Sequence, residues 1–201
     1  VWREDELQRL VELCSANGVI IFSDEIHCDV VSPPHRHTTL LNIDGAQSIG
    51  LVAHSIGKTF NTSGLQASFV IIPDSKLRSR FQSGAERMHA ADINLLGKVA
   101  IAHALSPQGA EYKRQLIAYL RENTLLVAER LKALDMEVMV PEATFLVWGD
   151  FRKFGPWKTV FDRLINDANV ALSGGTFFGP AGEGWFRINC AHPRSHLLPA
   201  V

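Results

Sequence analysis

Three short apolar runs near the start of the chain constrain the fold most strongly. They occupy residues 19–22, 49–53 and 67–72, and the first shows no alternation of apolar with polar side chains. Such a run is typical of a strand buried on both faces, as in a parallel sheet. Residues 4–16 carry apolar side chains at helical spacing and end at a helix stop signal, Asn17-Gly18. The sequence therefore predicts strands and helices that alternate in a parallel-rich α/β layer.

The rest of the chain divides into a helical stretch and a smaller mixed region. Residues 32–48 are expected to form a loop. Helices are expected at 75–90, where Asp74 or Ser75 can cap the first turn, at 93–105, and without interruption at 110–134. The later pattern predicts strands at 137–140, 144–148, 170–172 and 185–189, a helix at 156–168 and a Gly-rich segment at 173–184.

We therefore expect two domains. The first covers residues 1–124 and includes the start of the long linking helix, and the second is a truncated α+β domain over 125–201. Both ends of the sequence are interpreted as cuts, so the chain is expected to be a fragment.

The composition argues against several classes of protein. The net charge is −1, which favours neither nucleic acid nor an anionic membrane as a partner. No apolar run approaches the roughly 20 residues that span a bilayer. The three cysteines show no zinc-type spacing and no even set for a disulfide framework, so we expect a protein of the reducing cytoplasm.

Three polar residues stand where chemistry could occur. Asp24 and Lys58 follow the first two apolar runs, near the strand ends where α/β proteins bind ligands. A desolvated lysine is a nucleophile toward aldehydes, and a buried aspartate needs a cationic partner. Arg187 interrupts an apolar strand and could clamp a carboxylate. Taken singly, Lys58 is better explained as a surface lysine, Asp24 equally well as a turn residue, and Arg187 slightly better as a solvent-facing side chain.

Together with their neighbours these residues resemble one family, the fold-type I enzymes that depend on pyridoxal 5′-phosphate (PLP). Residues 23–29 (Ser-Asp-Glu-Ile-His-Cys-Asp) resemble the segment that binds the pyridine nitrogen. Residues 55–65 (Ser-Ile-Gly-Lys-Thr-Phe-Asn-Thr-Ser-Gly-Leu) resemble the segment with the cofactor-bearing lysine. Residues 186–189 (Phe-Arg-Ile-Asn) resemble the segment with the carboxylate-binding arginine. The resemblance is strongest to the MalY/PatB-type branch of the class I/II aminotransferase-like proteins, the cystathionine or cysteine-S-conjugate β-lyases.

Two details of the sequence point to that branch. His27 stands where many aminotransferases have tyrosine, and Gln66 stands where they often have arginine. The runs at 144–148 and 178–184 also look like this branch, so the resemblance covers essentially the whole chain. It implies that residues 1–124 are part of the large PLP-binding domain and 125–201 part of the small domain.

The resemblance implies a role for each candidate residue. Lys58 would hold the cofactor covalently and then act as the base at the substrate's Cα, and Asp24 would keep the pyridine nitrogen protonated. Ser55 would donate to the cofactor phosphate, and His27 would take the place of the tyrosine near the cofactor O3′. Arg187 would hold the substrate carboxylate. Gln66 cannot supply the charge of the arginine it replaces, so the phosphate would depend on other donors.

Three functions stay open at this stage. The first is a C–S β-lyase that releases pyruvate, ammonia and a thiol, the second is an aminotransferase of the same fold, and the third is an inactive truncated fragment. Lys58 serves the first two equally. The resemblance also implies a homodimer in the full-length protein and a small amino-acid substrate.

Other residues invite a functional interpretation that the sequence does not favour. His35 and His37 lie in a Pro-rich loop without a third ligand, so we expect a solvated loop and no metal. Cys28 has no feature that predicts reactivity. Phe145 and Trp148 are expected in the core of the small domain.

Overall fold

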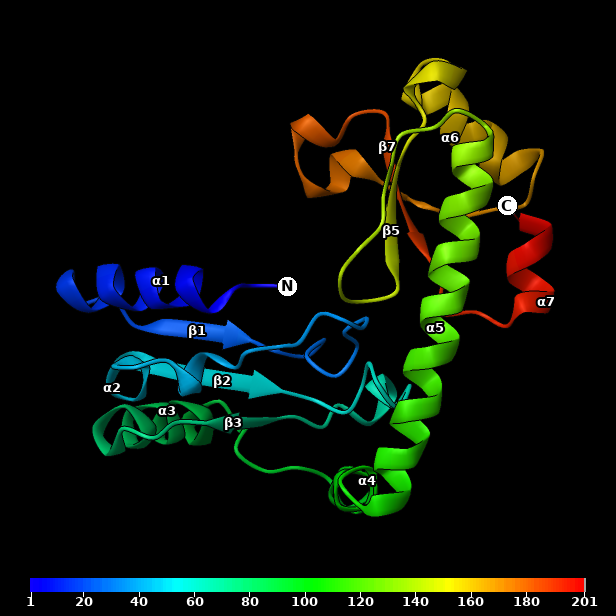
Figure 1. Ribbon diagram of the computed structural model, residues 1–201. Coiled ribbons are helices and arrows are strands. Elements are labelled where there is room, and N and C mark those ends of the chain that lie inside the picture. Colours follow the sequence, from blue (N-terminus) through cyan, green and yellow to red (C-terminus); the bar gives the residue numbers. More distant parts are fainter. Residues whose placement is uncertain (201) are drawn as a thin grey trace. The chain divides into compact units, whose positions relative to one another are not determined.

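The computed structural model describes residues 1–200. Its contacts divide the chain into two units, Val1–Gln115 and Leu116–Val201, and the division falls inside the long helix α5 (Pro107–Ala133). The predicted boundary, between residues 124 and 125, lies in the same helix. Figure 1 shows the elements in sequence order from blue to red.

The first unit is built on a three-stranded sheet in the order β1 (Ile21–Asp24), β2 (Gly50–His54), β3 (Phe69–Ile71). Strands β1 and β2 are parallel, as predicted, but β3 is antiparallel to β2. A parallel strand needs a crossover back along the sheet, usually a helix. The segment between β2 and β3 contains only turns and the short 3₁₀ helix Ser63–Leu65, so the chain reverses direction instead.

Five helices belong to this unit wholly or in part. Helices α1 (Glu4–Ala16) and α3 (Ser75–Arg87) confirm the predicted spans closely, and Asp74 caps α3 by accepting the Leu77 N–H at 2.7 Å. The others are α2 (Ala46–Ile49), α4 (Leu95–Ala104) and the first part of α5. Figure 1 shows α1 running beside β1.

One apolar cluster fixes the first two strands against α1. It contains Leu7, Val11, Leu40, Ile43, Ala46 and Val52, and Ile21 packs against it. The prediction that the first strand is buried on both faces is wrong: β1 begins two residues later than the apolar run, and Phe22 is 58% exposed. Ile21 packs against the cluster on one face of β1, whereas Phe22 points to the other face, which the described residues leave largely uncovered.

The second unit is a four-stranded antiparallel sheet in the order β4 (Val138–Met139), β5 (Leu146–Asp150), β7 (Trp185–Asn189), β6 (Ser173–Gly174). Helix α6 (Trp157–Asn166) matches the predicted span, and α7 (Arg194–Leu197) follows β7. The core contains Val127, Leu131, Val147, Phe151, Val160, Phe186 and Ile188.

The strand predicted at 170–172 is wrong. The N–H of Val170 donates to the Leu164 carbonyl of α6 at 2.8 Å, so pairing with β7 begins only at Ser173. The Gly-rich segment that follows forms two 3₁₀ turns, and a Cβ on Gly175 would collide with the Gly182 carbonyl oxygen. Close packing of the backbone therefore explains the glycines at 175 and 182.

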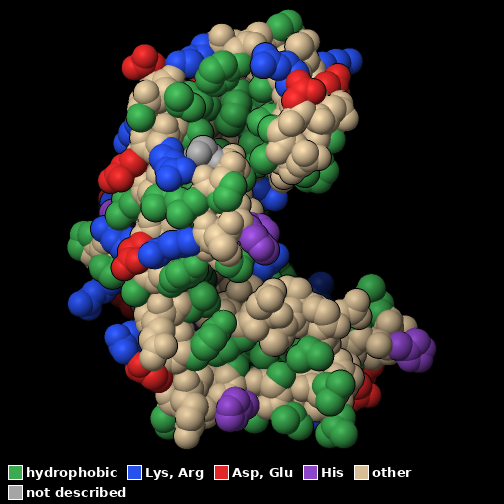
Figure 2. Space-filling view, turned by 90° about the vertical axis from the view of Figure 1, so that its right-hand side faces the viewer, with side chains coloured by type: hydrophobic (Ala, Val, Ile, Leu, Met, Phe, Trp, Pro, Cys, Tyr) green, Lys and Arg blue, Asp and Glu red, His purple; other side chains and the backbone are tan. Residues whose placement is uncertain are grey.

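The surface matches the near-neutral composition. On the face in Figure 2, basic and acidic side chains are interspersed among hydrophobic ones and do not gather by sign. Among the described residues, no helix has the length and apolar character needed to cross a membrane.

Candidate functional site

The carboxyl ends of β1 and β2 meet at one edge of the first sheet. Asp24, the last residue of β1, lies opposite Ala53, and the next N–H, of Glu25, donates to the Ala53 carbonyl at 2.9 Å. Because the strands are parallel, residues 25–29 and 55–65 leave the sheet from this same edge. This is where open α/β sheets bind ligands.

Asp24 is exposed at this edge, which fits a turn residue, one of the two interpretations that the sequence left open. Its position at the end of an edge strand explains the exposure. Oxygen Oδ1 accepts the Ile26 N–H at 3.1 Å, which fixes the side chain in a local turn. No described residue bonds to the second oxygen, Oδ2, which can therefore accept a proton or a hydrogen bond from a ligand.

Lys58 lies in a tight turn that follows β2. Hydrogen bonds from Phe60 N–H to the Ile56 carbonyl, 2.9 Å, and from Thr62 N–H to the Gly57 carbonyl, 3.1 Å, define the turn. The side chain of Lys58 is exposed, and its ammonium has no hydrogen bond or ion pair with any described residue. An amine without a counter-ion, beside a sheet edge, is available for reaction with a ligand carbonyl.

Gly57 and Ser55 shape that turn. A Cβ on Gly57 would lie 3.1 Å from the Ser63 hydroxyl and 3.2 Å from that of Ser55, which is tighter than ordinary contact. The Ser55 hydroxyl donates to the Ala67 carbonyl at 2.7 Å and accepts the Gly57 N–H at 3.0 Å. The hydroxyl proton of Ser55 is therefore already donated to a carbonyl of the protein. Donation to a phosphate would require the hydroxyl to turn away from Ala67.

His27 and Cys28 lie in the segment after β1, and both are partly buried. The Cys28 sulfur lies 3.6 Å from Nδ1 of His54. Burial, with the negative charges of Asp29 and Glu25, raises the pKa of the Cys28 thiol to about 11. The thiol is therefore protonated near neutral pH, in line with the prediction that Cys28 has no reactive role.

Glu25 is a buried carboxylate that the sequence analysis did not single out. It is 7% exposed and accepts hydrogen bonds from the Leu40 N–H at 2.9 Å and the Thr39 hydroxyl at 3.1 Å, with His37 Nε2 at 2.8 Å. Burial alone would raise its pKa, but the hydrogen bonds from His37, Leu40 and Thr39 hold the pKa below its usual value. The carboxylate anchors the loop that was expected to be solvated.

Two groups of side chains in this region have metal-ligand chemistry. Glu25, Cys28 and His37 form one, and Cys28, Asp29 and His54 form the other. In the first, Glu25 and His37 already bond to each other, and in the second, Asp29 is paired with the Lys113 ammonium at 2.8 Å. Both groups share the Cys28 thiol, whose sulfur lies 3.6 Å from Nδ1 of His54. The arrangement is better explained by hydrogen bonding than by a metal.

Arg187 belongs to the second unit, on β7. It faces away from the core side of the strand, which Phe186 and Ile188 occupy, and its Cζ lies 4.8 Å from the centre of the Phe178 ring. Trp148 was expected in the core but is only partly buried. It lies on the neighbouring strand β5, directly opposite Arg187. An arginine held over an aromatic ring with its edge exposed can bind a carboxylate in two-pronged fashion.

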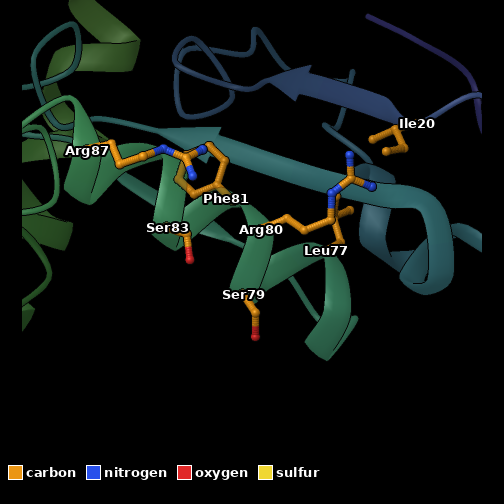
Figure 3. Close-up of a pocket in the computed structure, with 7 residues that line it drawn as sticks. All are labelled: Ile20, Leu77, Ser79, Arg80, Phe81, Ser83 and Arg87. Carbon is orange, nitrogen blue, oxygen red and sulfur yellow. The ribbon is translucent and has the colours of Figure 1, made fainter.

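A separate pocket lies on the helix side of the first unit. Leu77, Arg80, Phe81 and Arg87 of α3 line it together with Ile20, which precedes β1, and its volume is about 540 Å³. Figure 3 shows that Ser79 and Ser83 point away from the sheet there. The pocket adjoins the amino end of β1, whereas Asp24 ends that strand, so it is distinct from the candidate site.

Comparisons with known proteins agree on one family. The model of the family "Aminotransferase class I and II" matches residues 1–201. The chain is 35% identical over 193 residues to cystathionine beta-lyase PatB of Bacillus subtilis, covering 94% of this chain and 49% of that protein. It is 30% identical over 204 residues to Protein MalY of Escherichia coli, covering 100% of this chain and 52% of that protein.

A solved structure extends the comparison to the fold. Cystalysin from Treponema denticola, whose structure contains a pyridoxal 5′-phosphate cofactor, superposes with a TM-score of 0.93 at 27% identity. That match covers 100% of this chain and 52% of cystalysin, so the chain spans about half the length of the relatives it matches. The chain belongs to the class I and II aminotransferase family, with the fold of the fold-type I PLP enzymes.

Proposed function

We propose that the chain carries the cofactor lysine of a PLP-dependent carbon–sulfur β-lyase that cleaves cystathionine or cysteine S-conjugates. The observation that carries this proposal is the parallel pairing of β1 with β2, from whose shared edge Asp24 and the segment of Lys58 both emerge. A lyase is favoured over other members of the family by the 35% identity to a cystathionine beta-lyase over 94% of the chain.

The side chains at this edge fit the cofactor chemically. PLP, when bound, withdraws electrons from the substrate's α-carbon and so makes its proton removable. Asp24 offers a carboxylate oxygen without a partner for the protonated ring nitrogen, and Lys58 offers an unpaired amine for the aldehyde carbon. Gly57 leaves the space that the turn before the lysine needs. His27 and Ser55 complete the proposed set of cofactor contacts.

The remaining steps belong to acid–base and binding groups. Lys58 would act as the base that takes the proton from the substrate's Cα. Arg187 holds the substrate carboxylate, which fixes the Cα–H bond in one orientation. The bond between Cβ and sulfur then breaks with its electron pair leaving on sulfur, and water completes the release of pyruvate and ammonia.

An aminotransferase is the second candidate. The family is named for this activity, and Lys58 would serve as the proton-carrying group in either reaction. The two reactions differ in their co-substrates. Transamination consumes a 2-oxo acid acceptor, whereas β-elimination needs only water.

The experiment that tests the proposal measures pyruvate formed from cystathionine by the full-length protein, supplied with PLP and without any 2-oxo acid. A lyase releases pyruvate and thiol in equal amounts over many turnovers. Replacement Lys58→Ala should abolish release, while Lys76→Ala, which removes an exposed lysine of α3, should leave it unchanged. Consumption of cystathionine without pyruvate or thiol, continuing only when a 2-oxo acid is added to accept the amino group, would establish the aminotransferase instead.

A further inference from the structure

A mostly buried carboxylate, Asp29, lies five residues after Asp24 and has no role in the chemistry proposed above. Its side chain is 17% exposed and contacts three different segments of the first unit. Oδ1 accepts the Lys113 ammonium of α5 at 2.8 Å, and Oδ2 accepts the Thr59 hydroxyl at 3.0 Å. The third neighbour is His54, at the end of β2, with Nε2 at 3.6 Å from Oδ2.

Thr59 is the residue directly after Lys58 and is 1% exposed. A buried hydroxyl with a charged acceptor makes one of the stronger hydrogen bonds of a protein, because no water can replace it. This bond ties the backbone on the carboxyl side of Lys58 to the segment that begins at Asp24. On the amino side, the turn is held by the hydrogen bond of Thr62 to Gly57.

The groups that surround the Asp29 carboxylate include one direct positive partner. Lys113 provides the counter-charge, and its ammonium is itself 38% exposed. His54 is too distant for a hydrogen bond to Asp29, and its Nδ1 lies 3.0 Å from the Glu25 carbonyl. Cys28, protonated near neutral pH, adds no charge. A paired carboxylate of this kind holds its partners in one geometry.

We infer that Asp29 is a positioning residue that acts through Thr59 to fix Lys58 relative to Asp24. This inference rests on the proposed function, in which one cofactor ring must reach both Asp24 and Lys58. The span of that ring is rigid, so the spacing between the two segments has to be set by the protein. Asp29 sets it, because it lies on the Asp24 segment and bonds to the residue next to Lys58. Lys113 holds the other oxygen of Asp29 and so fixes the carboxylate plane.

Thr59→Val and Thr59→Ser form the matched pair for a test. Valine keeps the shape of threonine and removes the hydroxyl, while serine keeps the hydroxyl and removes the methyl group. The full-length protein is titrated with PLP, and the dissociation constant and the pH midpoint of the lysine-bound cofactor's absorbance are measured. We expect the valine variant to bind PLP about tenfold more weakly, the loss typical of a hydrogen bond to a charged group.

The pH midpoint distinguishes a hydrogen bond that positions Lys58 from one that only stabilises the fold. It should move by about half a pH unit or more in Thr59→Val, because the environment of the Lys58 nitrogen changes, and stay in place in Thr59→Ser. If Thr59→Val does not fold, Asp29→Asn is tested in its place. Asparagine keeps the side-chain volume but has only one carbonyl oxygen to accept from both Lys113 and Thr59. The PLP dissociation constant and the pH midpoint are measured for this variant too. Equal affinity and an unchanged midpoint in the folded valine or asparagine variant would overturn the inference.

The design separates this inference from the proposed function. If the unaltered protein shows no absorbance of lysine-bound PLP, the proposed function fails and the inference falls with it. If the unaltered protein shows that absorbance and the folded variants match it, only the role of Asp29 is wrong.

Discussion

The guanidinium of Arg187 lies over the ring of Phe178, with 4.8 Å between Cζ and the ring centre. This contact holds the planar group from one face, and the Ser173 hydroxyl lies 3.4 Å from Nη2. The planar edge that could meet a substrate carboxylate is therefore held in orientation before a ligand arrives, which lowers the entropic cost of binding.

Arg187→Lys tests the proposed carboxylate contact. Lysine keeps the charge but cannot make two parallel hydrogen bonds to a carboxylate. We expect KM for the amino-acid substrate to rise about 30-fold, close to the value of one hydrogen bond to a charged group. Phe178→Ala should raise KM only about threefold, as for one cation–π contact. Steady-state kinetics measure both, and an unchanged KM in Arg187→Lys would remove the residue from the site.

Gly57→Ala tests the turn that presents Lys58. The added methyl would press on the hydroxyls of Ser55 and Ser63, at 3.2 and 3.1 Å, so the turn must shift. We expect weaker PLP binding, measured by absorbance titration. Gly64→Ala in the same segment is the control, because nothing lies within 4 Å of its Cβ. Equal effects of the two substitutions would show that the spacing at Gly57 is not critical.

Glu25→Gln tests the buried network behind the loop that carries His37. Since hydrogen bonds hold the pKa of Glu25 below its ordinary 4.5, its carboxylate stabilises the fold above that pH and loses this contribution as the pH falls through the lowered pKa. At pH 7 the substitution should cost about 2 kcal/mol in free energy of unfolding.

The difference in free energy of unfolding between this variant and the unaltered protein should shrink as the pH falls through the lowered pKa of folded Glu25, because only below that pKa is Glu25 neutral in both the folded and the unfolded chain. Urea unfolding at a series of pH values measures it. Glu111→Gln is the control: Glu111 is exposed and pairs with Arg114 on the surface of α5, and such pairs stabilise little. A difference that does not shrink at any acidic pH at which both proteins still fold would contradict the role assigned to the charge of Glu25.

Cysteine reactivity gives a further check on the site. Burial raises the pKa values of Cys28 and Cys190 to about 11, so at pH 8 only about one thiol in a thousand is ionised. Both should react slowly with iodoacetamide in the folded protein and quickly in urea. Mass spectrometry of the labelled peptides measures the two rates. Rapid labelling of Cys28 in the folded protein would mean that the segment after β1 is open to solvent.

Local pattern singled out the candidate residues, but the family resemblance was needed to interpret them as one site. Asp24 and Lys58 follow the first two apolar runs, so each could be expected near a strand end, where α/β proteins bind ligands, before any coordinates. The same argument placed Arg187 on β7, since apolar neighbours on both sides left it the opposite face. The family resemblance supplied their proposed roles.

Contacts between distant segments could not be found in this way. Thr59 meets Asp29 across 30 residues, and Lys113 meets it across 84. No periodicity encodes such pairs, because each depends on how the segments after β1 and β2 and helix α5 fold together. The direction of β3 was missed for a related reason: an apolar run predicts a strand but not its orientation, which the connection from β2 decides.

The central claim is that Lys58 holds the cofactor, and peptide mapping tests it most directly. The full-length protein is incubated with PLP, reduced with borohydride to make the lysine–cofactor bond permanent, digested and analysed by mass spectrometry. We predict that the pyridoxyl-phosphate mass is found on the peptide containing Lys58 and disappears in Lys58→Ala. A mass found on Lys76 or Lys98, with Lys58 unmodified, would contradict the account.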